Sequence, residues 1–311
     1  MKRVVQLSPR AYERLVLVAA VAVAFIIVTG GAVRLTGSGL GCPDWPTCAR
    51  GHVVAALSYH QLVEFVNRVV TGLVSVAVIL AVLGSLVRRP RRRDLTWLSW
   101  GLVAGVVGQI VLGGVTVLEK LAPPYVMAHF LLSMALLADA VILHHRAGLA
   151  DPPEQTGRPV VDRDLVRVAR LMAVSTVVTI VAGTVVTSSG PHGGDASVRR
   201  WDISLHRVTQ IHGGFAILLL ALVLATMGLL RINAAPAVAR HRAQLVLEAL
   251  AAQIALGYTQ YFTGVPALLV GFHIFGAVLV WTAVLRFNLV MTAPSRRPVA
   301  VAVPTAVLAE A

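Results

Sequence analysis

The sequence predicts an all-α polytopic membrane protein with eight transmembrane helices, arranged as two side-by-side four-helix bundles from a parallel internal repeat. Three observations support this fold class. Hydrophobic residues make up 57% of the 311 residues and charged residues only 13%. The apolar runs are longer than the core helices of a soluble domain require, and one polar pattern occurs twice along the chain. A soluble globular domain is therefore excluded.

Each predicted helix is an apolar run of about 20 residues, which is the length that crosses a bilayer. In chain order the runs are 15–33, 62–87, 95–118, 124–143, 166–187, 209–230, 244–262 and 265–285. A Pro-rich and charged connection separates the first four from the last four. Because each half holds an even number of spans, both halves insert in the same orientation. We therefore expect an N-terminal half (1–147), a cytoplasmic linker (148–164), a C-terminal half (165–290) and a mobile cytoplasmic tail (291–311).

The formal net charge of +13 reflects membrane orientation rather than nucleic-acid binding. Most Lys and Arg residues lie on alternate connections, as the positive-inside rule requires, in the segments 2–14, 88–93, 146–170, 231–242 and 286–297. This pattern places both termini in the cytoplasm. The first apolar run is full length and lacks a small-residue cleavage site, so we expect it to remain in the protein.

Two histidines occupy equivalent places in the two halves. The pattern from Gln109 to His129 repeats without gaps from Gln253 to His273, 144 residues later. A buried, unpaired imidazole is costly inside a membrane, so a repeated one indicates a cofactor or substrate held between helices.

A third intramembrane histidine distinguishes the halves. Alignment of the second span with the sixth places Asn67 opposite His212. The second half therefore carries His212 and His273 on helices that face each other, an arrangement that binds heme iron in four-helix bundles. We predict a bis-histidine b-type heme there, with His129 as an iron ligand in the first half.

The first half offers a different set of groups around His129. His60, Glu64 and Asn67 are spaced i, i+4 and i+7, so on a helix they share one face. We expect a carboxylate, an amide and an imidazole to surround whatever His129 holds.

The loop after the first span contains the sequence GGAVRLTGSGLGCPDWPTC at residues 30–48. Cys42 and Cys48 are the two cysteines of the chain, and on the oxidising face of the membrane they predict a disulfide. The bond is either structural or redox-active, because short bridges near solvent are the labile kind. No C-x-x-C-H pattern is present, so any heme is expected to be bound noncovalently.

These motifs resemble the heme A synthase family. The resemblance rests on the loop at 30–48, on the Glu64-Phe-x-x-Arg68 start of the second span, and on the histidines of spans four, six and eight, and it covers nearly the whole chain. The composition, rich in Ala, Val and Arg, is similar to that of actinobacterial members. The resemblance implies a plasma-membrane oxidoreductase that converts heme O, its substrate, to heme A.

The resemblance also implies the site roles. Heme b is bound by His212 and His273 as cofactor, while heme O lies near His129 and Glu64, the expected catalytic residue. Many members have E-x-x-H-R where this chain has Glu64-Phe-Val-Asn67-Arg68. Three interpretations follow: an open axial position, compensation by His60, or an amide that does not coordinate. Heme O synthase and oxidase assembly factors are the implied partners besides the lipid bilayer, a homo-oligomer is left open, and no nucleic acid is expected.

Two other functions use similar features. A diheme b-type cytochrome, doing electron transfer only, would share the helices and histidines but favour two symmetrical bis-histidine sites. A transporter with parallel repeats would place polar groups at mid-membrane. The asymmetry between Asn67 and His212 favours an enzyme with one substrate site.

Overall fold

The fold consists of eight long α-helices in the part of the chain that the computed structural model describes, residues 6–49, 51–52, 54, 57–151 and 161–292. Their bounds are α1 Pro9–Leu35, α2 Tyr59–Val87, α3 Arg93–Leu118, α4 Pro123–Ala147, α5 Arg163–Ser189, α6 Leu205–Ile232, α7 Ala237–Phe262 and α8 Ala267–Met291. No named strand occurs in these ranges, so the predicted fold class is confirmed.

Seven of these helices are long and apolar enough to cross a membrane, which makes the protein a multi-pass membrane protein. Helix α7 is a helix of similar length, 26 residues, and begins seven residues before the predicted span at 244–262. It is not among the seven helices that are apolar enough to cross a membrane. Its composition is less apolar than that of the other seven, because Glu248, Gln253 and Gln260 interrupt its hydrophobic run. The structured helices also extend a few residues beyond the predicted spans at most ends. Ser8, for example, caps α1 by accepting a hydrogen bond from the backbone N–H of Ala11.

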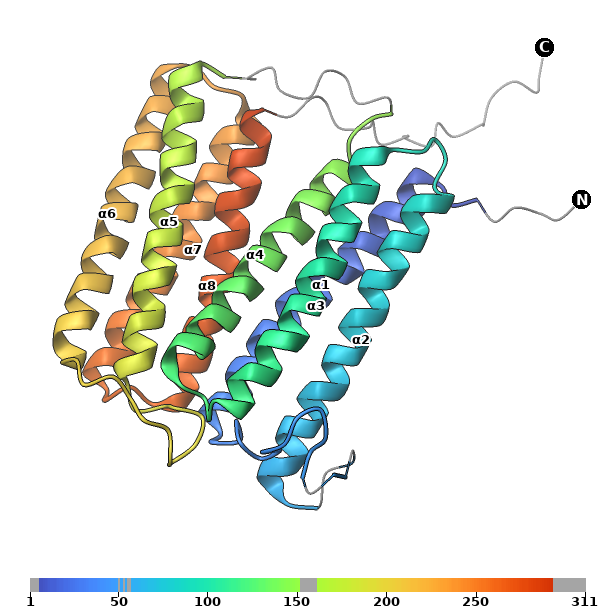
Figure 1. Ribbon diagram of the computed structural model, residues 1–311. Helices are drawn as coiled ribbons and strands as arrows, with labels where there is room; N and C mark the ends of the chain where they lie inside the picture. The colour runs from blue at the N-terminus through green and yellow to red at the C-terminus, as the bar shows by residue number, and fades with distance from the viewer. Residues whose placement is uncertain (1–5, 50, 53, 55–56, 152–160, 293–311) are drawn as a thin grey trace, which may run out of the picture.

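The helices form two bundles that lie side by side (Figure 1). In the first bundle α1 contacts α2 and α4, and α3 also contacts both. In the second bundle α5 contacts α6 and α8, and α7 also contacts both. In each ring the second and fourth helices are therefore diagonal partners, α2 with α4 and α6 with α8. This placement brings residues on those helices together from opposite sides of the bundle interior.

Helices α1, α4, α5 and α8 join the bundles. The indole N–H of Trp281 on α8 donates to the carbonyl of Met134 on α4 at 3.0 Å. A β-carbon added to Gly31 of α1 would lie 2.9 Å from the side chain of Ile274 on α8, so the two helices approach closely. These contacts lie within the continuous apolar core that both bundles share.

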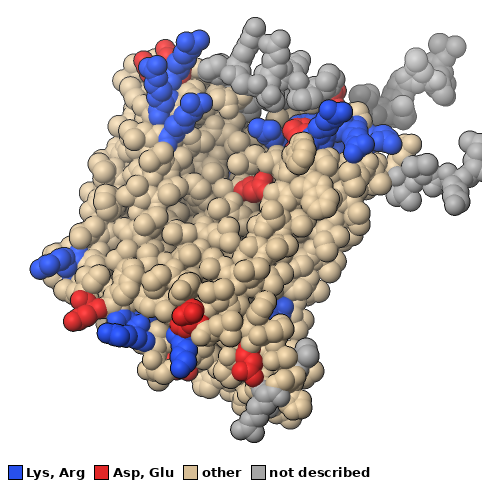
Figure 2. All heavy atoms as spheres, viewed as in Figure 1, with Lys and Arg blue, Asp and Glu red and all other residues tan. Residues whose placement is uncertain are grey.

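The two ends of the bundles differ in charge and connections. Helix α1 begins and α8 ends at one end, here called the arginine end, which also carries the connection at residues 88–92 (Figure 1). The opposite end, the disulfide end, carries residues 36–49 and 190–204. Figure 2 shows Lys and Arg at both rims and, between them, a surface that is mostly uncharged but carries an acidic side chain. At the arginine end the buried guanidinium of Arg88 pairs with Asp151 at 2.7 Å.

Part of the predicted linker (152–160) and all but the first two residues of the predicted tail (293–311) lie outside the described residues.

Candidate functional site: paired histidines in twin bundles

The second bundle brings two imidazoles together in its interior, with one ring edge-on to the other. His212 projects from α6 and His273 from the diagonal helix α8, and their ring centroids are 6.2 Å apart with planes at 74°. The Nδ1 of His212 donates to the backbone carbonyl of Thr179 on α5 at 3.1 Å. A carbonyl only accepts, so this bond fixes the tautomer and leaves Nε2 with a free lone pair.

The distance between the two ring centroids matches that of two imidazoles bound to one heme iron. With a metal–nitrogen bond of about 2 Å and roughly 1 Å more from nitrogen to ring centre, two imidazoles on one ion have centroids about 6 Å apart. No group of three or more His, Cys, Asp or Glu suited to a metal ion occurs among the described residues. A heme site needs none, because the porphyrin supplies four nitrogens and the protein only the axial ligands.

The repeat predicted from the sequence is present as identical contacts in the two bundles. Gln109 of α3 donates to the carbonyl of His129 at 3.1 Å, and Gln253 of α7 donates to the carbonyl of His273 at 2.9 Å. In both histidines Nδ1 is buried without a hydrogen-bond partner. The two bundles therefore hold His129 and His273 in the same way.

A glycine on the neighbouring helix accommodates each of these rings. A β-carbon built on Gly113 would lie 3.2 Å from Cε1 of His129, and one built on Gly257 would lie 3.1 Å from Cε1 of His273. Even a β-carbon at either position would require the imidazole to shift by a few tenths of an ångström. The sequence shows both glycines inside the repeat, but their role follows only from the packing of α3 on α4 and of α7 on α8.

Asn67 lies on α2, diagonal to α4, and differs from its counterpart His212. Its Oδ1 is buried and has no hydrogen-bond partner. No hydrogen bond joins its side chain to His129 in the described part of the chain. The first bundle thus presents one imidazole and one amide where the second presents two imidazoles.

Glu64 is buried at the disulfide end of α2 and binds the cysteine loop. Its Oε2 accepts the backbone N–H of Cys42 at 2.7 Å, and its Oε1 accepts two N–H groups of Arg68, at 2.7 and 3.2 Å. Arg68 also donates to the carbonyls of Cys42, Asp44 and Thr47. Together the two side chains hold the loop on α2. Sequence reasoning included Arg68 in the motif but missed these contacts, which link residues more than 20 positions apart.

The Cys42–Cys48 disulfide is formed, which confirms that prediction. The loop that it closes covers the end of the first bundle. A β-carbon added to Gly114 of α3 would lie 2.6 Å from the ring of Trp45, so the indole packs directly on the helix. The adjacent Gly113 accommodates the His129 ring. Trp45 and His129 therefore pack on adjacent residues of α3, an arrangement that the sequence alone did not reveal.

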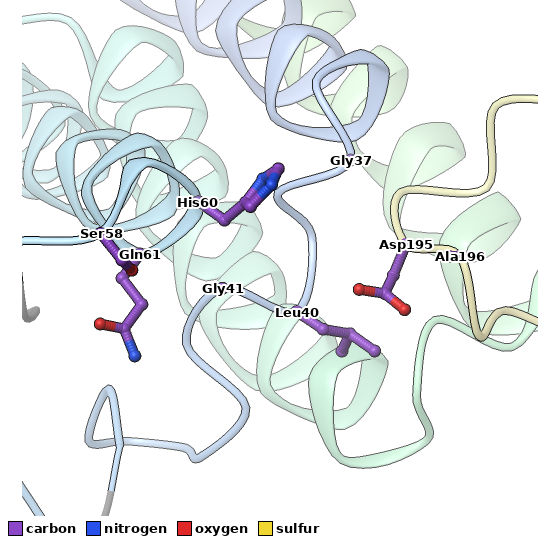
Figure 3. Close-up of a pocket in the computed structure, with 8 residues that line it drawn as sticks. All are labelled: Gly37, Leu40, Gly41, Ser58, His60, Gln61, Asp195 and Ala196. Atoms are coloured by element: carbon purple, nitrogen blue, oxygen red, sulfur yellow. The ribbon is translucent and has the colours of Figure 1, made fainter.

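His60 does not join Glu64 and Asn67 as the helical spacing predicted. Its Nδ1 is 3.0 Å from Oγ of Ser38 in the loop, and its ring lines an open pocket of about 480 Å³ at the disulfide end. Figure 3 shows Asp195, from the connection between α5 and α6, on another side of this pocket. Two hydrogen bonds from Ser197 hold the pKa of Asp195 below its usual range, and the nearby His60 adds to this effect. His60 is only the second residue of α2, and its side chain contacts Ser38 of the preceding loop.

The sequence is similar to a known protein family. The family model described as "COX15-CtaA: Cytochrome oxidase assembly protein" matches residues 13–58 and 53–192, more than half of the chain. The chain belongs to this family. The matched region contains the cysteine loop, Glu64, Asn67 and His129, but ends before His212 and His273. The prediction that His212 and His273 are heme ligands therefore depends on the internal repeat and on the geometry of the second bundle.

Curated relatives carry the name heme A synthase. The chain is 27% identical over 135 residues to one from Bacillus licheniformis (43% of this chain, 44% of the relative). It is 28% identical over 147 residues to one from Alkalihalophilus pseudofirmus (47% and 49%) and 33% identical over 123 residues to one from Listeria welshimeri (38% and 40%). The matched stretch thus spans less than half the length of each. The expected actinobacterial subtype stays a prediction.

Proposed function

We propose that the protein is a heme A synthase, which oxidises a ring methyl of heme O to the formyl group of heme A. The observation that carries the proposal is the unequal pair of sites in a duplicated fold. One bundle holds two neighbouring imidazoles, and the other holds His129, an unpartnered amide and the Glu64 loop. A cytochrome that only transfers electrons favours two symmetrical bis-histidine sites, whereas an enzyme with one cofactor and one substrate needs two different sites.

In this proposal His212 and His273 would hold heme b in the second bundle. Heme b supplies one-electron transfer. The Thr179 carbonyl orients His212, and Gly257 with Gln253 positions His273. These residues fix the ring orientations in advance, which strengthens binding and reduces motion during electron transfer.

The first bundle binds the substrate. His129 fixes the porphyrin of heme O, and Gln109 orients the helix turn that carries it. Glu64, at the end of α2, moves a proton or stabilises positive charge beside the reacting methyl. Trp45, in the disulfide loop, packs on Gly114 at this end of the bundle.

We also propose that the arginine end faces the cytoplasm, so that both termini are cytoplasmic and both heme sites lie toward the extracytoplasmic side. The positive-inside distribution of Lys and Arg supports this orientation. A substrate as apolar as heme O would then come from the bilayer, supplied by heme O synthase, and the product would pass to oxidase assembly factors.

The test is heme A formation in a bacterial host that makes heme O but has no heme A synthase of its own. Expression of this chain is expected to yield heme A, measured by chromatography of extracted pigments, and His129→Ala is expected to abolish it. His241→Ala, at an exposed position of α7, is the matched control and is expected to retain activity. Heme O without heme A in cells that contain normal amounts of the wild-type protein would contradict the proposal.

A further inference from the structure

His129 on α4 and His273 on α8 have matching contacts in the two bundles. The bundles differ on the diagonal helices, α2 and α6. On that side of the second bundle, the His212 ring packs on Gly183 of α5, where a β-carbon would lie 3.1 Å from Cε1. The sequence Gly30-Gly-Ala-Val of α1 aligns with Gly183-Thr-Val-Val of α5. Gly30 is therefore the first-bundle counterpart of Gly183, just as Asn67 is the counterpart of His212.

Gly30 borders open space. A β-carbon built on it would meet no atom within 4 Å, in contrast to one built on Gly183. The space lies on the protein side of α1, because Gly30 follows the buried residues Val23 and Ile27 by seven and three positions and so shares their face. The counterpart of His212 in this bundle is the shorter Asn67, and no atom of its side chain lies within 4 Å of a β-carbon on Gly30.

The amide of Asn67 has unused hydrogen-bonding capacity. Its Oδ1 is buried without a partner, and the amide group as a whole offers both a donor and an acceptor. His60, the other candidate ligand on α2, is bound to Ser38 in the loop pocket. No second imidazole from α2 is therefore placed opposite His129.

We propose that the substrate iron, held by His129, keeps its opposite axial position available to a small exogenous ligand of the dioxygen and carbon monoxide class, and that Asn67 hydrogen-bonds this ligand. This inference rests on the proposed function, because it assigns heme to the first bundle. Beyond the proposed function, the inference names the class of the second iron ligand and the residues that leave space for it. It also gives a reason why the two bundles differ. Gly30 provides the room, and Asn67 supplies the polar contact.

The test exchanges the two residues in the full-length protein, purified with heme in both bundles. Carbon monoxide is the probe for the reduced protein, and the high-spin signal in electron paramagnetic resonance is the probe for the oxidised protein. Wild type is expected to bind one carbon monoxide for its two hemes. Asn67→His is expected to lower this binding at least tenfold and to remove the high-spin signal, whereas His212→Asn is expected to add a second carbon monoxide site.

A second pair of variants tests the space itself. Gly30→Leu fills it and is expected to reduce carbon monoxide binding at least tenfold with unchanged heme content. Gly72→Leu is the matched control, because a β-carbon on this exposed glycine of α2 also meets nothing within 4 Å. It is expected to bind carbon monoxide as wild type does.

Failure of the inference differs from failure of the proposed function. If wild type forms heme A but its two hemes are both low-spin and do not bind carbon monoxide, the open axial position is wrong and the proposed function stands. If Asn67→His binds carbon monoxide as wild type does, the role of Asn67 is wrong. If no heme is recovered from the first bundle and no heme A forms, both proposals fall.

Discussion

Replacement of His273 by alanine is expected to abolish the low-spin b-type absorbance of the purified protein. The variant removes one of two imidazoles whose centroids lie 6.2 Å apart, so the remaining His212 holds the iron from one side only. Loss of residues that merely orient a ligand already weakens metal binding by about 10- to 100-fold, and loss of the ligand itself is expected to cost more. The measurement is the reduced-minus-oxidised spectrum together with heme content per polypeptide.

Chemical rescue makes this prediction specific. His273→Gly leaves room for free imidazole beside Gly257, so added imidazole is expected to restore the low-spin spectrum. His241→Ala again serves as control, because it removes an exposed histidine from the same bundle. A low-spin spectrum of wild-type intensity in His273→Ala without added imidazole would show that the second bundle binds its heme through other residues.

Replacement of Glu64 by alanine is expected to reduce heme A formation by about 100-fold or more, the usual size of a general acid or base contribution. The structure adds a second role that must be separated from this one, because Glu64 also holds the loop through Cys42 and Arg68. Glu64→Gln separates them. The amide oxygen still accepts the Cys42 N–H, and Arg68 keeps its own bonds to the loop carbonyls. The amide NH2 cannot accept from Arg68, and the side chain no longer carries negative charge or exchanges a proton.

We expect Glu64→Gln to be as inactive as Glu64→Ala, although its protein level and its disulfide remain normal. The disulfide is measured by thiol labelling before and after reduction, and heme A by chromatography. If Glu64→Gln keeps most of the activity while Glu64→Ala loses it, the residue acts only as a support for the loop. Normal heme A formation in Glu64→Ala at normal protein levels would remove Glu64 from the catalytic site altogether.

Much of the fold could be predicted from the sequence because bilayer thickness and repeated motifs are strong constraints. Apolar runs located the helices, and the Gln109–His129 and Gln253–His273 windows predicted the repeat. The structure adds the matching bonds from each glutamine to its histidine carbonyl. Helix α7 shows where hydropathy is a weaker guide. Its polar residues make it less apolar than a typical span, yet it completes the second ring of helices between α6 and α8.

Contacts between distant segments could not be predicted in the same way. His60 shares a helical face with Glu64 and Asn67 by spacing, but at the start of α2 the loop residue Ser38 determines its direction. The packing of Trp45 on Gly114 depends on the path of a loop that has no periodicity to follow. The roles of His129, His212, His273, Glu64 and Asn67 in heme binding and catalysis remain predictions, as do the domain boundaries.

The most direct test of two unequal heme sites is pigment extraction from the purified protein, compared between wild type, His273→Ala and His129→Ala. The account predicts that wild type yields heme B together with heme O and heme A. His273→Ala is expected to lose mainly heme B, and His129→Ala mainly heme O and heme A. A colourless wild-type protein, or one that yields heme B alone and loses equal amounts of it in both variants, would contradict the account.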